Sequence, residues 1–449
     1  MRCLKWSAGT RAVRGLGFSL GRGGSATHKS SLPALASIGV GVRLASGDAA
    51  GGAELKKSPL YDLHVAKGAK MVPFAGYSLP IQYQDSSISD SHHFTRKHAS
   101  IFDVSHMVQH LFRGPGAVDF LERITPSDWH DLPHMEAKLT TLLWDKTGGI
   151  VDDCMVTRLG DQEFFVVTNG ACLEKDVGFI RDELKRLKMQ DTVKWSVLQD
   201  AGLIALQGPG AAKALGKVLA SDIGLDTFYF GTSRWADLKS CEGAEPHTVL
   251  ISRGGYTGED GFEISFNMVD KAAPTAAIIE ALLNAAGPEN VRLAGLGARD
   301  SLRLEAGMCL YGNDLDDTTT PVEAGLSWVV SPGRRKMPGS FNGADKIISQ
   351  LTPRSKGGSG VERRRVGLLI QGAPAREGAE IQKDGQKVGV VTSGGPSPTL
   401  GKNIAMGYVK DGLHKSGTPL DVLVRGRKRE AVVTKMPFVP ANYYKAVKK

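Results

Sequence analysis

Two adjacent carboxylates, Asp152 and Asp153, open an apolar run that follows a pair of glycines. Successive side chains of a strand point to opposite faces, so only one of the two can enter a given cavity. A carboxylate held over an apolar floor has a perturbed pKa and can transfer a proton. The alternative is a pair that caps a turn without chemical use. Alternation does not decide which of the two aspartates points inward, because Asp152 shares the parity of Cys154 and Asp153 shares that of Met155.

A second candidate region is rich in glycine and acids and runs from Gly254 to Gly261. Its composition predicts a tight connection between two strands. Tyr256 and Glu263 are the candidates for a pocket side, because a buried glutamate offers two acceptors to a heterocycle with paired N–H groups. The alternative is a hairpin turn with a solvated glutamate.

A third candidate is Arg299, which follows a glycine-rich entry into a helix over residues 294–308. A helix start favours anions, and a guanidinium can bind a carboxylate with two hydrogen bonds. Trp328 can stack on a planar ligand or fill the core. The lone His106 is interpreted as structural, because no nearby acid or nucleophile completes a triad. Met107 either fills the core or forms the wall of an aromatic ligand's pocket.

The elements that must position these residues are predicted from periodicity and turn residues. The aspartate pair begins a hairpin whose second strand is Phe164–Thr168, and residues 101–108 form a short strand. Two prolines make residues 71–83 an ordered loop or edge segment. The other predicted elements are helices over 90–99, 172–189, about 209–219 and 269–286, and a strand over 203–206.

The C-terminal part follows a linker near residues 354–360. Five short strand patterns, spaced by Gly and Pro turns, predict a small all-β barrel. They cover residues 366–370, 388–392, 404–409, 420–424 and 431–436.

Composition limits the classes of protein to which the chain can belong. The chain has 449 residues, 41% hydrophobic and 23% charged, which suits a soluble protein of two or three domains. No apolar run is long enough to span a membrane. Five cysteines, none in a CxxC pattern, favour reduced thiols over a disulfide framework or a zinc cluster. Asp314–Asp317 lacks the glycine and the final glutamate of a calcium loop, so we expect a polar turn and no metal.

The net charge of +9 is concentrated in residues 1–47, which hold seven Lys or Arg and no acid. Without those seven cations the net charge falls to +2, so nucleic-acid binding is not indicated. A basic, Ser-rich, acid-free leader predicts a mitochondrial transit peptide over 1–47, cleaved near Arg43–Ser46.

Several motifs occur in one order along the chain and together resemble the aminomethyltransferases, the T proteins of the glycine cleavage system. The resemblance implies an α+β fold, with two interleaved N-terminal domains (48–353) around a central folate pocket and a C-terminal β-barrel (354–449). It implies a matrix enzyme that transfers the methylene of an aminomethyl group on lipoyl-H protein to tetrahydrofolate, releasing ammonia and 5,10-methylenetetrahydrofolate. H protein would be the partner, with P and L proteins bound loosely. The motifs span 71–80, 102–107, 148–153, 255–261, 295–300 and 392–400.

By motif position, the resemblance makes Asp153 the catalytic carboxylate. Glu263 would hold the pterin with Tyr256 beside it, and Arg299 would suit the carboxylate tail. The remaining predicted contacts are Met107, Asn169 and Trp328 along the pocket, and Tyr443 against the substrate. Where some members carry a pocket tyrosine, this chain has Thr140.

Three other classes of folate-binding protein are the alternatives to this resemblance. Folate-binding halves of sarcosine or dimethylglycine dehydrogenases carry a flavin domain, for which this chain has neither the glycine fingerprint nor the length. Folate-binding accessory proteins of iron–sulfur assembly carry a Lys-Gly-Cys-Tyr-x-Gly-Gln-Glu stretch, which is absent. A non-catalytic folate-binding module is the third, and the presence of Asp153 argues against it.

Overall fold

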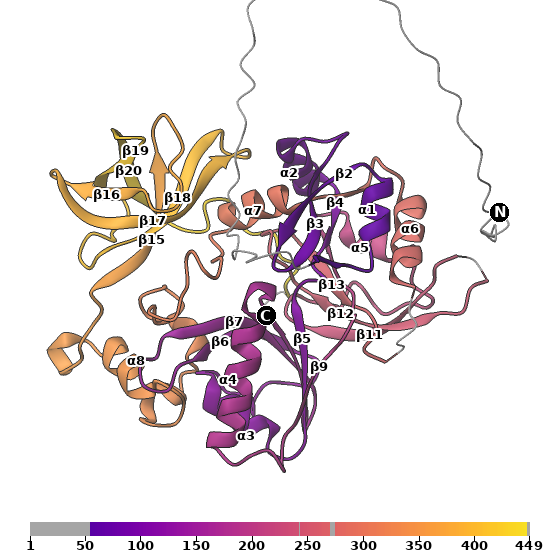
Figure 1. The fold of residues 1–449 in the computed structure, drawn as a ribbon, viewed down its shortest axis with the longest axis horizontal. Helices are drawn as coiled ribbons and strands as arrows, with labels where there is room; N and C mark the ends of the chain where they lie inside the picture. Colours follow the sequence, from indigo (N-terminus) through magenta and orange to yellow (C-terminus); the bar gives the residue numbers. More distant parts are fainter. Residues whose placement is uncertain (1–53, 242, 270–273, 447–449) are drawn as a thin grey trace, which may run out of the picture. The chain divides into compact units, whose positions relative to one another are not determined.

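The computed structural model describes residues 54–241, 243–269 and 274–446, so the predicted transit peptide lies outside the described residues. Within them the chain forms three open sheets, a closed barrel and eight α-helices (Figure 1). None of these helices is both long and apolar enough to cross a membrane. The mixed α+β class predicted from the sequence is confirmed.

A six-stranded sheet holds the first apolar core. Its order is β11-β12-β13-β10-β4-β14, and its neighbours are antiparallel except for β14 and β4. Helices α5 (Ala211–Leu215) and α6 (Thr275–Ala286) cover buried side chains such as Ile204 and Phe262. The strands are β4 (Ala99–Asp103), β10 (Leu203–Gln207), β11 (Ser233–Leu238), β12 (His247–Arg253), β13 (Gly261–Ser265) and β14 (Val291–Leu293).

A five-stranded antiparallel sheet, in the order β6-β7-β8-β5-β9, holds the second core. Helices α3 (Ala117–Ile124) and α4 (Leu173–Arg186) pack against one of its faces. The predicted hairpin is confirmed as β7 and β8. The strands are β5 (Val108–Arg113), β6 (Ala137–Leu143), β7 (Ile150–Gly160), β8 (Glu163–Thr168) and β9 (Lys194–Val197).

The two sheets are interleaved along the chain. Strand β4 belongs to the six-stranded sheet, β5–β9 form the five-stranded one, and β10 returns to pair with β4. The single strand predicted over 101–108 is therefore wrong, because the chain changes sheets between β4 and β5. Buried Asp103 fixes the break by accepting hydrogen bonds from the Ser105 backbone N–H, at 3.0 Å, and from His64 Nε2, at 2.9 Å.

Apolar side chains from both sheets meet in a shared core together with helix α7 (Leu296–Glu305). Phe102 and Ala205 come from the six-stranded sheet, Leu111 and Val167 from the five-stranded one, and Leu302 from α7. We call this cluster the inter-sheet core. Asp153, Glu263 and Met107, described below, face or pack against it.

A small sheet at the N-terminal side was not predicted. Residues 71–83, expected to be an ordered loop or edge segment, form most of the hairpin β2 (Ala69–Phe74) and β3 (Tyr77–Tyr83), and β1 (Lys56–Lys57) pairs with β3. The positive φ angles of Ala75 and Gly76 make the turn. Helices α1 (Tyr61–Ala66) and α2 (Ile88–Lys97) flank it, and α2 confirms the helix predicted over 90–99.

The C-terminal barrel is confirmed, in the order β15-β18-β17-β16-β19-β20 (Figure 1). Five strands match the predicted patterns, whereas the short polar strand β16 was missed. The predicted domain boundary between residues 353 and 354 stays a prediction. Helix α8 (Ala344–Leu351), which precedes it, packs with residues of β6 and β7. The strands are β15 (Arg363–Ile370), β16 (Glu380–Lys383), β17 (Gln386–Ser397), β18 (Lys402–Lys410), β19 (Pro419–Val424) and β20 (Arg427–Thr434).

Two predicted helices differ in their limits. Helix α6 begins at Thr275, with Pro274 as its N-cap, and residues 270–273 of the predicted helix lie outside the described residues. Helix α5 ends at Leu215, short of residue 219, with Gly216 as its C-cap. The short 3-10 helices are η1 (Gly170–Cys172), η2 (Ser327–Val329), η3 (Arg334–Lys336) and η4 (Arg354–Lys356).

Candidate active site

Strand β7 places its two aspartates on opposite faces of the five-stranded sheet. Cys154 packs into the core beneath α3 and α4, and Asp152 shares its parity. Met155 lies opposite Val167, a member of the inter-sheet core, and Asp153 shares that parity. Directly paired residues point to the same face. Asp152 is therefore directed at α4 and Asp153 at the inter-sheet core.

The start of β7 is fixed by a bulge and a close backbone contact. Leu142 pairs with Asp152, whereas Leu143 pairs with Ile150, so β7 carries one extra residue. A Cβ on Gly149 would lie 1.8 Å from the carbonyl oxygen of Asp317, which only glycine can avoid. The glycine pair noted in the sequence thus serves this approach and sets where the aspartates begin.

Asn169 joins the two aspartates from the end of β8. Its backbone N–H and its Nδ2 each donate to the Asp152 carboxylate at 2.8 Å, and Nδ2 also donates to Asp153 Oδ1 at 3.0 Å. The amide therefore holds the Asp153 carboxylate in a defined position.

The pKa of the Asp153 carboxyl lies near neutral pH. Burial and, after it, the negative charge of Asp152 raise its pKa from the ordinary 3.8 to about 7, against the opposing effect of the hydrogen bond from Asn169. A general acid or base is most effective when its pKa lies near the working pH. This is the chemistry expected of a catalytic carboxylate.

Glu263, Tyr256 and Arg299 form a second group beside the same core. Glu263 on β13 lies opposite Ala205, an inter-sheet core residue, so it points toward that core. The Arg299 guanidinium on α7 stacks 4.8 Å from the centre of the Tyr256 ring. The Tyr256 hydroxyl donates to the carbonyl of Cys309, and Asp153 helps to raise the tyrosine pKa, after burial as the main cause. The two groups of residues are thus electrostatic neighbours.

Glu263 and Arg299 are both left with unused hydrogen-bonding capacity. Burial raises the pKa of Glu263 and lowers that of Arg299, and each charge opposes the shift of the other. Arg299 Nη1 is buried without a hydrogen-bond partner. Buried polar groups without partners are rare and often indicate a ligand that supplies them. An acceptor and a donor of this kind suit a ligand with N–H groups and a carboxylate.

His106 and Met107 border this region, between β4 and β5. Burial and, after it, the charge of Arg299 lower the His106 pKa to about 4, so the imidazole is neutral. Its ring packs edge-on against Phe74 at 5.1 Å. Met107 is partly buried against the inter-sheet core, as core filling or a pocket wall requires.

Trp328 and Tyr443 lie apart from these groups. Trp328, on η2, is 53% exposed, so it does not fill the core. Tyr443 stacks on Phe230 with ring centres 4.1 Å apart, and the charges that act on its pKa are those of Arg96 and Glu259, after burial. Across residues 54–241, 243–269 and 274–446, neither aromatic shares a hydrogen bond, ion pair or ring contact with the Asp153 or Arg299 groups.

Thr140 turns away from Asp153. It pairs with Cys154, its Oγ1 lies 2.8 Å from Ser127 Oγ, and it is fully buried on the α4 side of the sheet. Thr141 is the residue opposite Asp153, and its buried hydroxyl has no partner in the described chain.

Sequence reasoning missed two buried polar groups. Asp176 on α4 faces Asp152, and a carboxylate at helical spacing between Leu173 and Ile180, on the apolar face, was the available signal. Asp314, expected in a polar turn, is almost fully buried and forms an ion pair with Arg303 at 2.9 Å. Ser393 of the barrel donates to the same carboxylate, which joins the barrel to α7.

Two family models match the chain. Residues 60–334 match the family described as "GCVT N-terminal domain", and residues 363–440 match the "Glycine cleavage T-protein C-terminal barrel domain". Together they cover most of the described residues, including β7, β13 and α7.

Relatives cover nearly the whole chain. A "Probable aminomethyltransferase, mitochondrial" of Schizosaccharomyces pombe is 44% identical over 396 residues, 88% of this chain and 96% of its own. The human "Aminomethyltransferase, mitochondrial" is 46% identical over 391 residues, 87% and 91% respectively. The crystal structure of glycine cleavage system aminomethyltransferase T from Bartonella henselae is 36% identical, covers 87% of this chain and 100% of its own, and superposes with a TM-score of 0.75.

Proposed function

The chain belongs to the glycine cleavage T-protein family of aminomethyltransferases, and we propose that Asp153 is the catalytic carboxylate of its reaction. The enzyme transfers the methylene of an aminomethyl group, carried on lipoyl-H protein, to tetrahydrofolate. Ammonia and 5,10-methylenetetrahydrofolate are the products. It is a mitochondrial enzyme, like the relatives that carry that word in their names.

The observation that carries the role of Asp153 is its environment. The carboxyl faces the inter-sheet core, is held by Asn169 and has a pKa of about 7. Its ionised form would stabilise positive charge on the carbon that is transferred, and its protonated form could supply a proton to the departing amine. One well-placed group of this kind contributes roughly a hundred- to ten-thousand-fold to the rate.

Tetrahydrofolate supplies the nitrogen atoms that accept the methylene. Glu263 has no side-chain hydrogen-bond donor among the described residues, and Arg299 Nη1 has no acceptor. These two groups fit a molecule with a donor-rich pterin and a carboxylate tail. We assign the pterin to Glu263, with Tyr256 beside it, and the tail to Arg299.

The other predicted contacts are assigned by position. Asn169 contacts Asp153, Met107 packs against the inter-sheet core that Asp153 faces, and both would line the pocket. Trp328 offers an exposed indole for stacking, and Tyr443 offers a ring and a hydroxyl from the C-terminal segment to the substrate. H protein is the partner that presents the lipoyl arm, and P and L proteins would associate loosely.

Ammonia release from aminomethylated H protein, with and without tetrahydrofolate, tests the assignment of Asp153. Asp153→Asn should lower turnover about a hundredfold or more in single-turnover assays, with little loss of folate affinity. Asp152→Asn should cost much less. The matched control is Asp161→Asn, because Asp161 lies on the same hairpin with its side chain 82% exposed. Wild-type turnover by Asp153→Asn would remove the assignment and favour a different proton carrier.

A further inference from the structure

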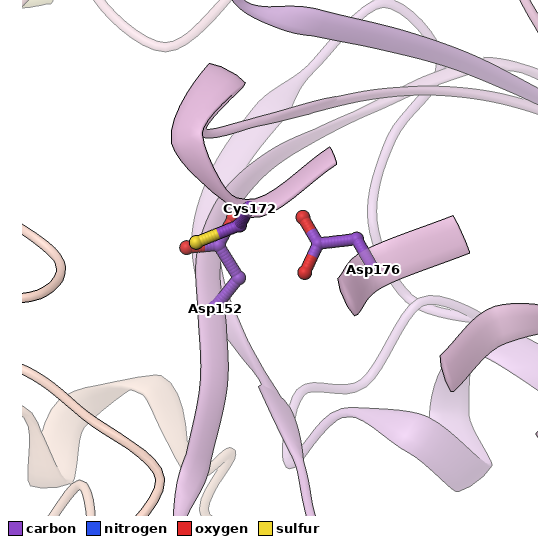
Figure 2. Close-up of side chains that lie close together, drawn as sticks. All are labelled: Asp152, Cys172 and Asp176. Carbon is purple, nitrogen blue, oxygen red and sulfur yellow. The ribbon is translucent and has the colours of Figure 1, made fainter. Parts of the chain in front are cut away.

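Three buried side chains converge behind the proposed catalytic strand. Asp152 on β7, Cys172 on η1 and Asp176 on α4 bring their oxygen and sulfur atoms within 4.8 Å of one another (Figure 2). Both aspartates have 0% exposure and Cys172 has 5%. The carboxyl group of Asp176 points toward the other two (Figure 2).

The hydrogen bonds of the two carboxyls are unequal. Both oxygens of Asp152 accept from Asn169, at 2.8 Å each. Neither oxygen of Asp176 has a donor in good hydrogen-bond geometry, although both are buried and the Thr168 side chain acts to lower the pKa of this carboxyl. A buried carboxylate without a donor or a cation is costly, and a second carboxylate beside it adds repulsion. The two acids therefore cannot both be ionised at low cost.

The surrounding groups do not neutralise the pair. The titratable groups that face it are Asp153 and Cys154 on β7, Cys172 on η1, Lys175 on α4, and Tyr311. Lys175 directs its ammonium to the Tyr311 hydroxyl and, at 3.4 Å, to Asp317. Burial raises the pKa of the Cys172 thiol, so it stays protonated. Neither Asp152 nor Asp176 has an ion pair with Lys or Arg within the described residues.

We propose that Asp152 and Asp176 share one proton, which Asp176 carries and donates to the ionised Asp152. The assignment follows from the donors: Asn169 supplies two short hydrogen bonds to Asp152, which favour its charged form, whereas the Thr168 side chain is the weaker donor that acts on Asp176. Burial raises the pKa of both acids, in agreement with a pair that holds a proton at neutral pH.

The pair has a function that rests on the proposed role of Asp153. Ionised Asp152 fixes both donors of Asn169, and the same Nδ2 reaches Asp153 Oδ1 at 3.0 Å. Asp176 is thus a positioning residue, two hydrogen bonds removed from the carboxyl that it positions. The pair also sets a constant single negative charge beside Asp153.

Replacement of Asp176 separates this proposal from a merely structural role. Asp176→Asn keeps an N–H donor and the single charge of the pair, so activity should stay within about twofold and the pH profile should not move. Asp176→Ala removes the donor, and activity should fall about tenfold, the worth of one hydrogen bond. Asp182→Asn, at an exposed position of the same helix, is the control. If Asp176 were ionised, Asp176→Asn would remove a charge and shift the profile to lower pH, which would overturn the proposal.

An infrared measurement tests the proton without using activity. The difference spectrum between Asp153→Asn and Asp153→Asn/Asp176→Asn should contain the C=O band of a protonated carboxylic acid at neutral pH. Carboxylate bands in its place would overturn the proposal. A stoichiometric metal in the purified wild type that is lost in Asp176→Asn would overturn it too, in favour of a cation site. Full activity of Asp153→Asn would instead remove the proposed function and leave the shared proton standing.

Discussion

Glu263 and Arg299 come from a strand and a helix that border one core, and each opposes the pKa shift that burial imposes on the other. They do not form an ion pair in the part of the chain that the structure describes. An acid and a base that are near but unpaired leave both groups available to a ligand. Because the two side chains are near each other, the separation of the ligand groups that they bind is limited.

Removal of either residue should weaken tetrahydrofolate binding by about 1.5–3 kcal/mol, the usual worth of a hydrogen bond to a charged group. Glu263→Ala should weaken full-length folate and an analogue without the glutamate tail alike. Arg299→Ala should weaken the full-length ligand only, because the analogue lacks its partner. Titration calorimetry on the four pairs measures this. An equal loss of both ligands in Arg299→Ala would place Arg299 at the pterin end beside Glu263.

The activity should depend on pH through Asp153. Because the pKa of this carboxyl is raised to about 7, turnover should fall as the pH decreases below about 7 and the ionised fraction is lost. Asp153→Asn should lack this limb and be slower at all pH values. Single-turnover rates between pH 5 and about 9 give the profile. The same acidic limb in Asp153→Asn would assign the titration to another group.

Asp153 should also make the protein less stable at neutral pH. The folded chain holds the proton more tightly, with a pKa of about 7 against the ordinary 3.8, so the unfolding free energy decreases as the pH rises through this window. Asp153→Asn cannot ionise, so it should be more stable than wild type above about pH 7 by roughly 1 kcal/mol or more, and the gain should vanish near pH 4. Urea unfolding at several pH values measures the difference, with Asp161→Asn as the control. A constant gain across the range would contradict this origin.

The Arg303–Asp314 pair should be a major anchor between α7 and the barrel. Asp314→Ala removes one of the two carboxylates that pair with the buried Arg303, the other being Asp300 at 2.8 Å, and should cost about 3 kcal/mol of unfolding free energy. Ser393→Ala removes a hydroxyl that donates to Asp314 and accepts from Arg303 Nη2 but leaves both charges in place, so it should cost less, about 1.5 kcal/mol. Chemical denaturation compares the two. Equal costs would show that the charge of Asp314 is not what the anchor needs.

Parts of the fold follow directly from local pattern. The β7–β8 hairpin and five barrel strands have alternating apolar residues bounded by turn residues, which is sufficient information. Strand β16 was missed because Glu380–Lys383 is short and polar. The β2–β3 hairpin was missed because its prolines argue against strands, although Pro73 and Pro80 both pair across it.

The site shows the same division. Asp153, Glu263 and Arg299 could be predicted because motif position identified residue types that can do chemistry, and their roles stay predictions. The position of Asp176 beside Asp152 and the direction of the Thr140 side chain depend on which face each residue occupies and on a bulge near Leu142. Composition fixes neither of these. The sheet change at Asp103 is equally invisible to periodicity, because an apolar run looks the same whether or not its two ends enter one sheet.

The interleaving of the two sheets constrains how the polypeptide can be made. Asp103 on β4 pairs with Ile204 on β10, with the whole five-stranded sheet between them in the chain. A chain that enters a compartment N-terminus first therefore presents β4 with an unpaired edge until about a hundred further residues have followed. Pairings this distant in sequence slow folding and leave edges exposed to aggregation. The architecture that directs Asp153 and Glu263 at one core thus delays the pairing of β4 until most of the N-terminal region has been made or imported.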